Sequence, residues 1–444
     1  MHEAQSLVLF GLNPLWLATV VMIITYGVII SERLNRSIIA LLGAMLMIMT
    51  GLLTQEQAVA GIDFNTIGLL VGMMIIVSIT RKCGVFEYLA IWSAKLVKAN
   101  PAGILAMLAV VTAVTSAFLD NVTTVLLVVP VTLVITEALK VNPYPFLFSQ
   151  IFASNIGGTA TLIGDPPNIL IGGQVGLSFN DFVLNLAPVI IIVLIVHVFS
   201  IHLLWGRGMS AASALRERVM GFDEAKVISD PRLLKLASLV LALVIVAFVF
   251  ARYLHFESGT IGMAGAALLL MLDNLGQSAE QQGKNVLKVY NEIEWVTIFF
   301  FVGLFIVVTG VERAGLLKLL ADNLLAATGG DFTVTGVSVL WSSAILSSII
   351  DNIPFVATMI PLIKAMAPTF GGPDALLPLW WSLSLGACLG GNGTLIGASA
   401  NLTVAGIAER NGIPFSFMTY LKIAFPLMLM HVAICNVYLM WRYF

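Results

Sequence analysis

Charged side chains are scarce in this sequence. Asp, Glu, Lys and Arg make up 10% of its 444 residues and hydrophobic residues 59%, whereas about a quarter of the residues in a soluble globular chain are charged. Such a composition is typical of a membrane protein. The longest polar stretch covers only about residues 206–231. A soluble catalytic domain is therefore excluded, and we expect the protein not to be an enzyme.

Cysteine is also nearly absent. Cys83, Cys388 and Cys435 lie far apart, which excludes a disulfide framework and a paired-cysteine metal site. The net charge of −2 does not suggest nucleic acid as a partner. No phosphate-binding loop signature occurs, so the chain itself is not expected to hydrolyse ATP. We predict no metal and no other cofactor.

Long apolar runs dominate the chain, and about 20 such residues are needed to cross a bilayer as a helix. The runs predict ten crossings at about 14–30, 37–53, 64–80, 145–163, 183–205, 233–251, 259–275, 294–311, 377–397 and 417–440. Two further stretches, 101–139 and 332–367, are too long for one crossing and carry a polar break at their centre. Each is either two crossings or one re-entrant hairpin, and we favour the hairpin. Residues 86–97 and 314–327 are predicted to form amphipathic arm helices at the interface.

The basic residues indicate how the chain is oriented. With these spans, 17 of the 22 Lys and Arg residues fall on one side, which the positive-inside rule makes cytoplasmic. Both termini are then extracytoplasmic. The predicted location is the plasma membrane, as a multi-pass protein of a bacterial or archaeal inner membrane. The first apolar stretch is interpreted as a retained helix rather than a signal peptide.

An internal repeat relates the two halves of the chain. At an offset of 231 residues, Asp120-Asn121 meets Asp351-Asn352, Asp63 meets Glu294 and Thr66 meets Thr297. After a two-residue slip, the glycine-rich stretches 157–164 and 390–397 align as well. Each half has five crossings and one hairpin, so the second half is inverted relative to the first. We therefore predict an all-α polytopic fold with a first inverted repeat at 14–205, a cytoplasmic linker at 206–232 and a second repeat at 233–440, which is an architecture of secondary transporters.

Glycine, proline and hydroxyl groups interrupt one predicted span in each repeat. Broken helices occur in membranes only where they are buried in protein or line a cavity, and their free backbone ends can hold an ion or a small polar solute. We expect such discontinuous helices near the midplane, together with the two hairpin tips. The candidate binding residues are Asp120, Asn121, Thr123, Thr124, Asn155, Gly157, Gly158, Thr159, Thr161, Asp165, Asn168, Asp351, Asn352, Gly390, Gly391, Asn392, Gly393, Thr394 and Asn401.

Three aspartates stand out because intramembrane carboxylates are rare and usually functional. Asp120 and Asp351 are predicted at the hairpin tips as proton-coupling candidates, although a helix-capping role is the plainer alternative. Asp165 has no acidic counterpart in the second repeat and is expected near the outer face, with a site role and a structural role equally open. The spans place no Lys or Arg at the midplane, which favours a neutral solute or a cation over a multivalent anion.

Four long motifs resemble those of the ArsB/NhaD permease family, which includes arsenite efflux pumps, sodium/proton antiporters and the melanosomal P protein. They are SAFLDNVTT (116–124), NIGGTATLIGDPPN (155–168), SSIIDNIPF (347–355) and GACLGGNGTLIGASAN (386–401). Word for word they are most similar to the P-protein branch. The wider ion-transporter superfamily implies a scaffold domain, a moving domain with two re-entrant hairpins, elevator-type alternating access and a homodimer.

The resemblance leaves several functions open. The favoured one is proton-coupled efflux of arsenite or antimonite, which are uncharged hydroxy acids at neutral pH and suit amide, hydroxyl and backbone partners. A sodium/proton antiporter would use the same acids, and an anion channel is implied by the P-protein branch. A soluble ATPase subunit is a further partner to be considered. An intramembrane aspartyl protease is rejected, since its Gly-x-Gly-Asp signature is absent before Asp165.

Overall fold

The computed structural model describes residue 8, residues 11–31 and residues 33–444, and the regular structure in these ranges is entirely helical. The first half contains α1 (Pro14–Ile30), α2 (Arg36–Met49), α3 (Gln55–Ala60), α4 (Phe64–Arg81), α5 (Val85–Leu96), α6 (Pro101–Ser116), α7 (Asn121–Leu139), α8 (Tyr144–Thr159), α9 (Pro166–Val175), α10 (Phe179–Asn185) and α11 (Ala187–Leu204). The linker carries α12 (Ser213–Met220). The second half contains α13 (Pro231–Leu254), α14 (Ser258–Asn274), α15 (Ala279–Asn291), α16 (Trp295–Arg313), α17 (Leu316–Ala327), α18 (Phe332–Ile349), α19 (Asn352–Ala365), α20 (Ala367–Phe370), α21 (Leu377–Gly390), α22 (Ser399–Arg410) and α23 (Phe417–Arg442).

The all-helical membrane fold predicted from the sequence is confirmed. Seven of the described helices are long and apolar enough to cross a membrane, and four more are apolar but shorter. The span expected at 183–205 is shorter than predicted, because a capping box at Ser178 starts the separate short helix α10 before α11 begins. Helix α15 lies in a stretch for which no helix was predicted, and Ser278 caps it.

Local sequence determines where the helices begin. Asp63 caps α4 by accepting hydrogen bonds from the Asn65 and Thr66 amides, and a side chain of this type satisfies amides that have no partner within the helix. A glycine with positive φ precedes each arm helix, Gly84 before α5 (φ 74°) and Gly315 before α17 (φ 88°). Glycine adopts this conformation without steric cost. Helices therefore lie at both predicted arm positions.

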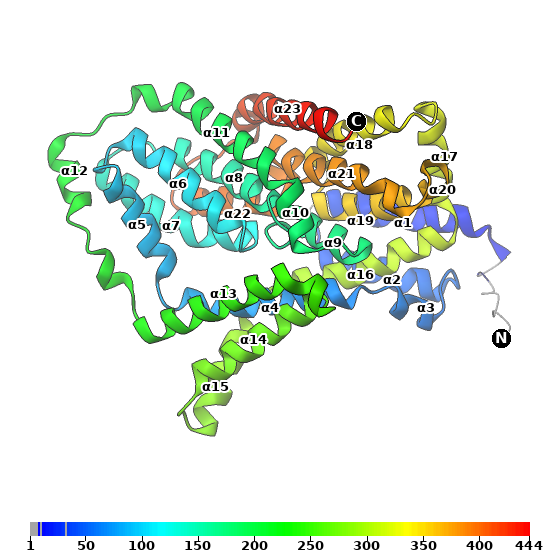
Figure 1. Ribbon diagram of the computed structural model, residues 1–444, viewed down its shortest axis with the longest axis horizontal. Helices are drawn as coiled ribbons and strands as arrows, with labels where there is room; N and C mark the ends of the chain where they lie inside the picture. Colours follow the sequence, from blue (N-terminus) through cyan, green and yellow to red (C-terminus); the bar gives the residue numbers. More distant parts are fainter. Residues whose placement is uncertain (1–7, 9–10, 32) are drawn as a thin grey trace.

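The helices pack into two groups (Figure 1). In the first, named the scaffold group, α4 packs against α14, α2 against α16, α1 against α2 and α13 against α14. In the second, named the hairpin group, α6 packs against α8 and α18 against α21, with α11 and α23 outside them. The hairpin group also includes α7, α9, α19 and α22, and here helices from different halves pair, α7 with α22 and α9 with α19. Each of these contacts has a counterpart at the repeat-equivalent position, which supports the predicted inverted repeat.

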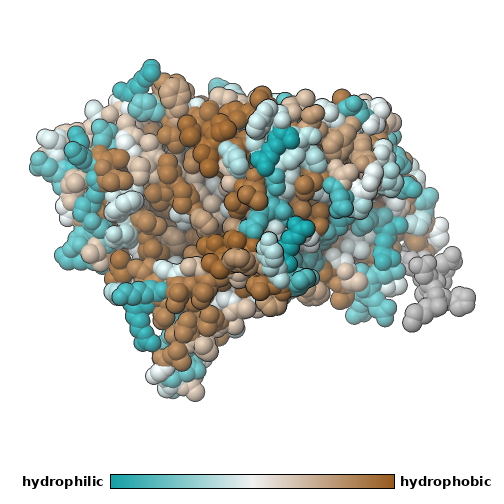
Figure 2. All heavy atoms as spheres, in the orientation of Figure 1, coloured by the Kyte–Doolittle hydropathy of each residue, from teal (hydrophilic) through white to brown (hydrophobic). Residues whose placement is uncertain are grey.

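The surface has the distribution expected of a membrane protein. Figure 2 shows apolar residues gathered over the middle of this face and hydrophilic residues toward both ends of the long axis. Side chains exposed on the scaffold helices include Leu239, Leu243 and Phe250 of α13. In water such a surface would be costly, whereas in a bilayer it faces lipid tails.

The linker returns to the first arm helix. Lys95 of α5 forms an ion pair with Glu224 at 2.5 Å, and Arg216 donates to the Lys98 carbonyl at 2.8 Å. The hydrogen bond from Lys95 lowers the pKa of Glu224. The linker is thus placed beside the basic loop 81–98, in agreement with the expectation that both lie on one side of the membrane.

Candidate functional site

Each hairpin tip ends in an aspartate that caps the following helix. At the first tip, Asp120 accepts hydrogen bonds from the Thr123 amide at 2.8 Å and from the Thr123 hydroxyl at 2.5 Å. At the second, one oxygen of Asp351 accepts from the Ile353 amide at 3.0 Å. The capping role that the sequence left open is therefore present at both tips. Asp120 has both oxygens satisfied within its own helix, whereas Asp351 has a second oxygen directed elsewhere.

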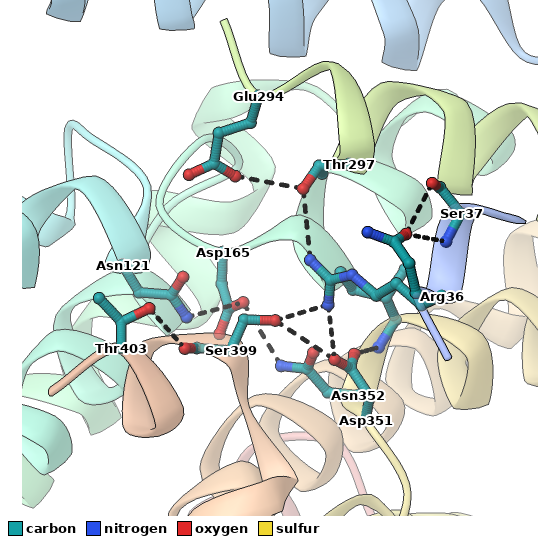
Figure 3. A network of polar contacts seen from close by, with 12 residues as sticks. Arg36, Ser37, Asn121, Asp165, Glu294, Thr297, Asp351, Asn352, Ser399 and Thr403 are labelled. Carbon is teal, nitrogen blue, oxygen red and sulfur yellow. Dashed lines mark hydrogen bonds and ion pairs between the residues drawn. The ribbon is translucent and has the colours of Figure 1, made fainter. Parts of the chain in front are cut away.

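Asp165 lies between the two tips (Figure 3). Its Oδ1 accepts hydrogen bonds from Asn121 Nδ2 at 3.2 Å and from Asn352 Nδ2 at 3.5 Å, so one carboxylate contacts both hairpins. The residue is 0% exposed, and its Oδ2 has no hydrogen-bond partner. The expectation that Asp165 lies near the outer face was wrong. Helix α9 begins at Pro166 and Pro167, directly after the helix break. Asp165 therefore lies at the break itself.

A chain of asparagine amides joins the two halves next to Asp165. Asn121 donates to Asn155 Oδ1 at 3.0 Å. Asn155 in turn donates to Asn392 Oδ1 at 2.9 Å and to Asn401 Oδ1 at 3.0 Å. All four side chains are buried, and Asn392 Nδ2 has no partner. The structure thus brings together predicted site residues that lie up to 280 positions apart in the sequence (401 minus 121).

Other predicted site residues stabilise the two helix breaks. Asn168 donates to the Thr161 and Thr159 carbonyls, and Asn401 donates to the Thr394 and Gly391 carbonyls. The Thr161 hydroxyl donates to the Ala117 carbonyl, and the Thr394 hydroxyl to the Ser348 carbonyl. These residues hold the unwound segments in place, as buried backbone groups require.

The predicted glycines let other backbones come close. A Cβ at Gly157 would overlap the Ala113 carbonyl of α6, and one at Gly390 would overlap the Ala344 carbonyl of α18. Gly158, Gly391 and Gly393 are similarly crowded by backbone or side-chain atoms. Thr124 lies near the first tip, and its buried hydroxyl has no partner. The glycines thus position the helices rather than line the space around Asp165.

The sequence reasoning missed a basic residue at the site. Arg36, assigned to a cytoplasmic loop, begins α2 and forms an ion pair with Asp351 at 3.0 Å. The expectation of a site without Lys or Arg was therefore wrong. Glu294 and Thr297, at the start of α16, and Ser399, at the start of α22, were missed as well (Figure 3). The repeat match of Glu294 to Asp63 was the one signal that could have drawn attention to α16.

The polar groups surround a small cavity. Asp120, Asp165 and Glu294 line a space of about 30 Å³ together with Arg36 and Asn352, which is enough for a water molecule or a small cation. A wider cavity of about 420 Å³ lies between the scaffold and hairpin groups, lined by Asp63, Glu312 and Lys364 among others. Over residues 8, 11–31 and 33–444, no group of three or more His, Cys, Asp or Glu side chains has the geometry of a metal site.

Comparison with known families decides the class of protein. The CitMHS family, described as citrate transporters, matches residues 26–386 of the chain. The chain belongs to the CitMHS family. An uncharacterized transporter of Mycobacterium tuberculosis is 41% identical over 431 residues, which cover 96% of this chain and 98% of that protein. A 46 kDa membrane protein of Mycobacterium leprae is 41% identical with the same coverage.

The P protein is a more distant relative of this CitMHS chain. The human P protein is 33% identical over 96% of this chain, which spans 59% of the length of that protein. The predicted likeness to the P protein is thus confirmed, while the narrower assignment to ArsB/NhaD stays a prediction. The crystal structure of the Alcanivorax borkumensis YdaH transporter has the same fold, with a TM-score of 0.60 at 14% identity over 96% of this chain and 98% of that one. The protein is therefore a membrane transporter of the ion-transporter superfamily.

Proposed function

We propose that this protein is a cation-coupled secondary transporter in which Asp165 binds the coupling proton or cation. The observation that carries the proposal is the environment of Asp165: buried, held by both hairpins through Oδ1, and without a partner at Oδ2. A buried carboxylate oxygen without a partner is costly unless it binds a proton or a cation. Asp120 and Asp351, the candidates favoured by the sequence, already have partners for both oxygens.

An elevator motion of the hairpin group against the scaffold group is part of the proposal. Asp165, Asn121 and Asn352 all belong to the hairpin group, so a coupling ion bound there would travel with that group. The cavity of about 420 Å³ at the boundary between the groups supports relative motion. Inverted repeats are suited to alternating access, because each half can adopt the conformation that the other half had in the opposite-facing state.

For the solute, two classes have support. Arsenite or antimonite, favoured by the sequence, would suit the amide groups of Asn155, Asn392 and Asn401. A carboxylate is supported by the description of the CitMHS family and by Arg36, because guanidinium groups bind carboxylates in a matching geometry. Sodium/proton antiport would need only Asp165 and its carboxylate neighbours. An anion channel has the weakest support, since the cavity at Asp165 is narrow and lined by three acids.

The experiment is flux in everted membrane vesicles that contain the protein, with an imposed pH gradient. Arsenite, citrate and sodium are offered separately, and vesicles without the protein serve as the blank. We expect gradient-dependent movement of one of these solutes. Movement of each solute at the blank rate, with and without sodium, would contradict coupled transport of these solutes. Rapid, gradient-independent anion flux would support a channel instead.

A further inference from the structure

Arg36 connects the scaffold group to the tip of the second hairpin. Its guanidinium donates to Asp351 Oδ2 at 3.0 Å and to Ser399 Oγ at 2.7 Å, both in the hairpin group. It also donates to Thr297 Oγ1 at 3.3 Å and lies 5.1 Å from the centre of the Phe300 ring, both on scaffold helix α16. Figure 3 shows the guanidinium between Thr297, Ser399 and Asp351. One arginine thus contacts both groups of helices at the site.

The ion pair lies between two cavities. Arg36 and Ser399 line the space of about 30 Å³ that contains Asp165, and they also line a second cavity of about 280 Å³. Asp351 lines this cavity of about 280 Å³, together with Ile29, Leu34 and Leu402. Because the two cavities share Arg36 and Ser399, the Arg36–Asp351 pair lies between the cavity of about 280 Å³ and Asp165.

The geometry allows the pair to open without displacing Arg36. When Asp351 and Ser399 move away with the hairpin group, Thr297 and Phe300 remain beside the guanidinium on the scaffold. The Arg36 and Asp351 side chains are 26% and 19% exposed, so water can replace either partner. A partly hydrated ion pair is far easier to separate than a fully buried one.

Among the residues that the structure describes, no ion pair connects the first hairpin tip to the scaffold group. Asp120 is satisfied by Thr123 of its own helix. The scaffold helix equivalent to α2 is α14, which begins at Ser258, and there the Gly259 amide donates to Asn65 within the scaffold group. The ionic contact between scaffold and hairpin is therefore found at one of the two tips, although the Asp-Asn pair is repeated at both.

We propose that Arg36 is a positioning residue that holds the second hairpin tip closed over Asp165, so that the Arg36–Asp351 ion pair is the gate between the 280 Å³ cavity and the coupling site. This inference rests on the proposed function, because a gate has a purpose only if Asp165 exchanges an ion. The role of gate residue falls to Arg36 because its side chain lines both cavities. The charge of the pair, rather than its bulk, keeps the tip in place.

The test measures access to the site instead of flux. Ile353 lines the small cavity beside the tip and is 3% exposed, so Ile353→Cys serves as the reporter for a membrane-impermeant thiol reagent. The three native cysteines are buried, and labelling of the chain without the reporter gives the blank. The experiment uses the full-length chain in liposomes, and size-exclusion chromatography shows which variants are folded.

We expect Arg36→Gln and Asp351→Asn each to speed labelling of the reporter by about tenfold. The Arg36–Asp351 pair is partly buried, so its loss should cost more than that of an exposed ion pair and less than that of a fully buried one. Arg36→Lys keeps the charge and should label nearly as slowly as the parent. The charge-swapped pair, Arg36→Asp with Asp351→Arg, should recover slow labelling. Tyr26→Phe removes the uncharged hydrogen bonds from α1 to the Pro354 carbonyl and to Thr358 of the same hairpin and should change the rate little.

Unchanged labelling in Arg36→Gln, or equally fast labelling in Arg36→Lys and in the swapped pair, would overturn the gate. If Arg36→Gln does not fold, Asp351→Asn and the swapped pair decide the question in the same way. Labelling is independent of transport, so failure of the coupling role of Asp165 would leave these rates unaffected. The surface pair Lys284–Glu280 provides a control in which Lys284→Gln should alter neither labelling nor flux.

Discussion

At the scale of single residues, the site is defined by which polar atoms have partners. Asp120, Asp165 and Asp351 are all acids of the predicted site, but Asp165 alone among these three keeps an unpartnered carboxylate oxygen. The sequence identified all three acids and the asparagines beside them. It favoured Asp120 and Asp351 over Asp165 as coupling candidates, because the contacts with Arg36 and Asn352 that distinguish the acids come from distant positions in the chain.

Cys388 provides a prediction at this scale. Its thiol lies 3.5 Å from Asn168 Oδ1, and the residue does not line the cavity at Asp165. Cys388→Ser replaces a weak donor with a stronger one of similar size, so we expect transport, arsenite included, to be retained within about twofold, as for a volume-conserving change. Flux in vesicles measures this. Loss of arsenite flux alone would show that a thiolate binds the solute.

At the scale of elements, helix packing carries Arg36 to the site. A Cβ at Gly303 of α16 would lie 2.5 Å from the Ala40 carbonyl carbon and 2.7 Å from the Leu41 amide of α2. These are backbone atoms, so they can yield only if α2 and α16 separate. Gly303→Val should therefore destabilise the protein by about 1–3 kcal/mol, measured by thermal unfolding in detergent.

A matched control lies on α15, where a Cβ at Gly283 meets no atom within 4 Å. Gly283→Val should leave the unfolding temperature unchanged or slightly raised, since glycine is a poor helix former. Equal destabilisation by both substitutions would show that the close approach of α2 to α16 does not matter for stability.

Apolar runs and helix-breaking glycines and prolines predicted most of the helices. The apolar stretches and their capping residues indicate where helices lie, and the glycine-rich runs indicate the two breaks before α9 and α22. The short helix α10 and the amphipathic α15 were missed because neither is apolar enough to resemble a crossing. The position of Arg36 was missed for a different reason: charge statistics assign an arginine at a helix start to a loop, and only packing shows that it points inward.

At the scale of the whole molecule, the elevator proposal requires α9 to move against α4. A Cβ at Gly173 of α9 meets the Thr66 hydroxyl of α4, so cysteines at these two positions are close enough for a disulfide. Oxidation of the Thr66→Cys, Gly173→Cys protein should stop transport, and a reductant should restore it. Continued transport in the oxidised protein would contradict motion between the two groups.

The control disulfide lies within the scaffold group. A Cβ at Gly61 meets the Thr309 hydroxyl of α16 in the same manner. Oxidation of the Gly61→Cys, Thr309→Cys protein should leave transport intact, because neither residue changes partners in the proposed motion. The two double variants introduce the same pair of residue types, so they differ only in whether the disulfide crosses the boundary between the groups.

The orientation in the membrane is a separate prediction for the whole molecule. The distribution of basic residues puts residue 220 of the linker in the cytoplasm and Phe444 outside, while Met1, also expected outside, falls outside the described residues. Single cysteines at residue 220 and at Phe444 should react with an impermeant reagent from opposite sides of intact cells. A cytoplasmic Phe444 would rule out the inverted arrangement of the two halves.

The central claim is that Asp165 couples the transport of a solute to a cation. The most direct measurement compares gradient-driven accumulation with solute exchange in liposomes that contain the Asp165→Asn protein. Asn keeps the size of the side chain but cannot release a proton or balance a cation's charge. We predict that accumulation falls to the level of protein-free liposomes while exchange down a gradient persists. Accumulation at the parental rate in Asp165→Asn would contradict the account.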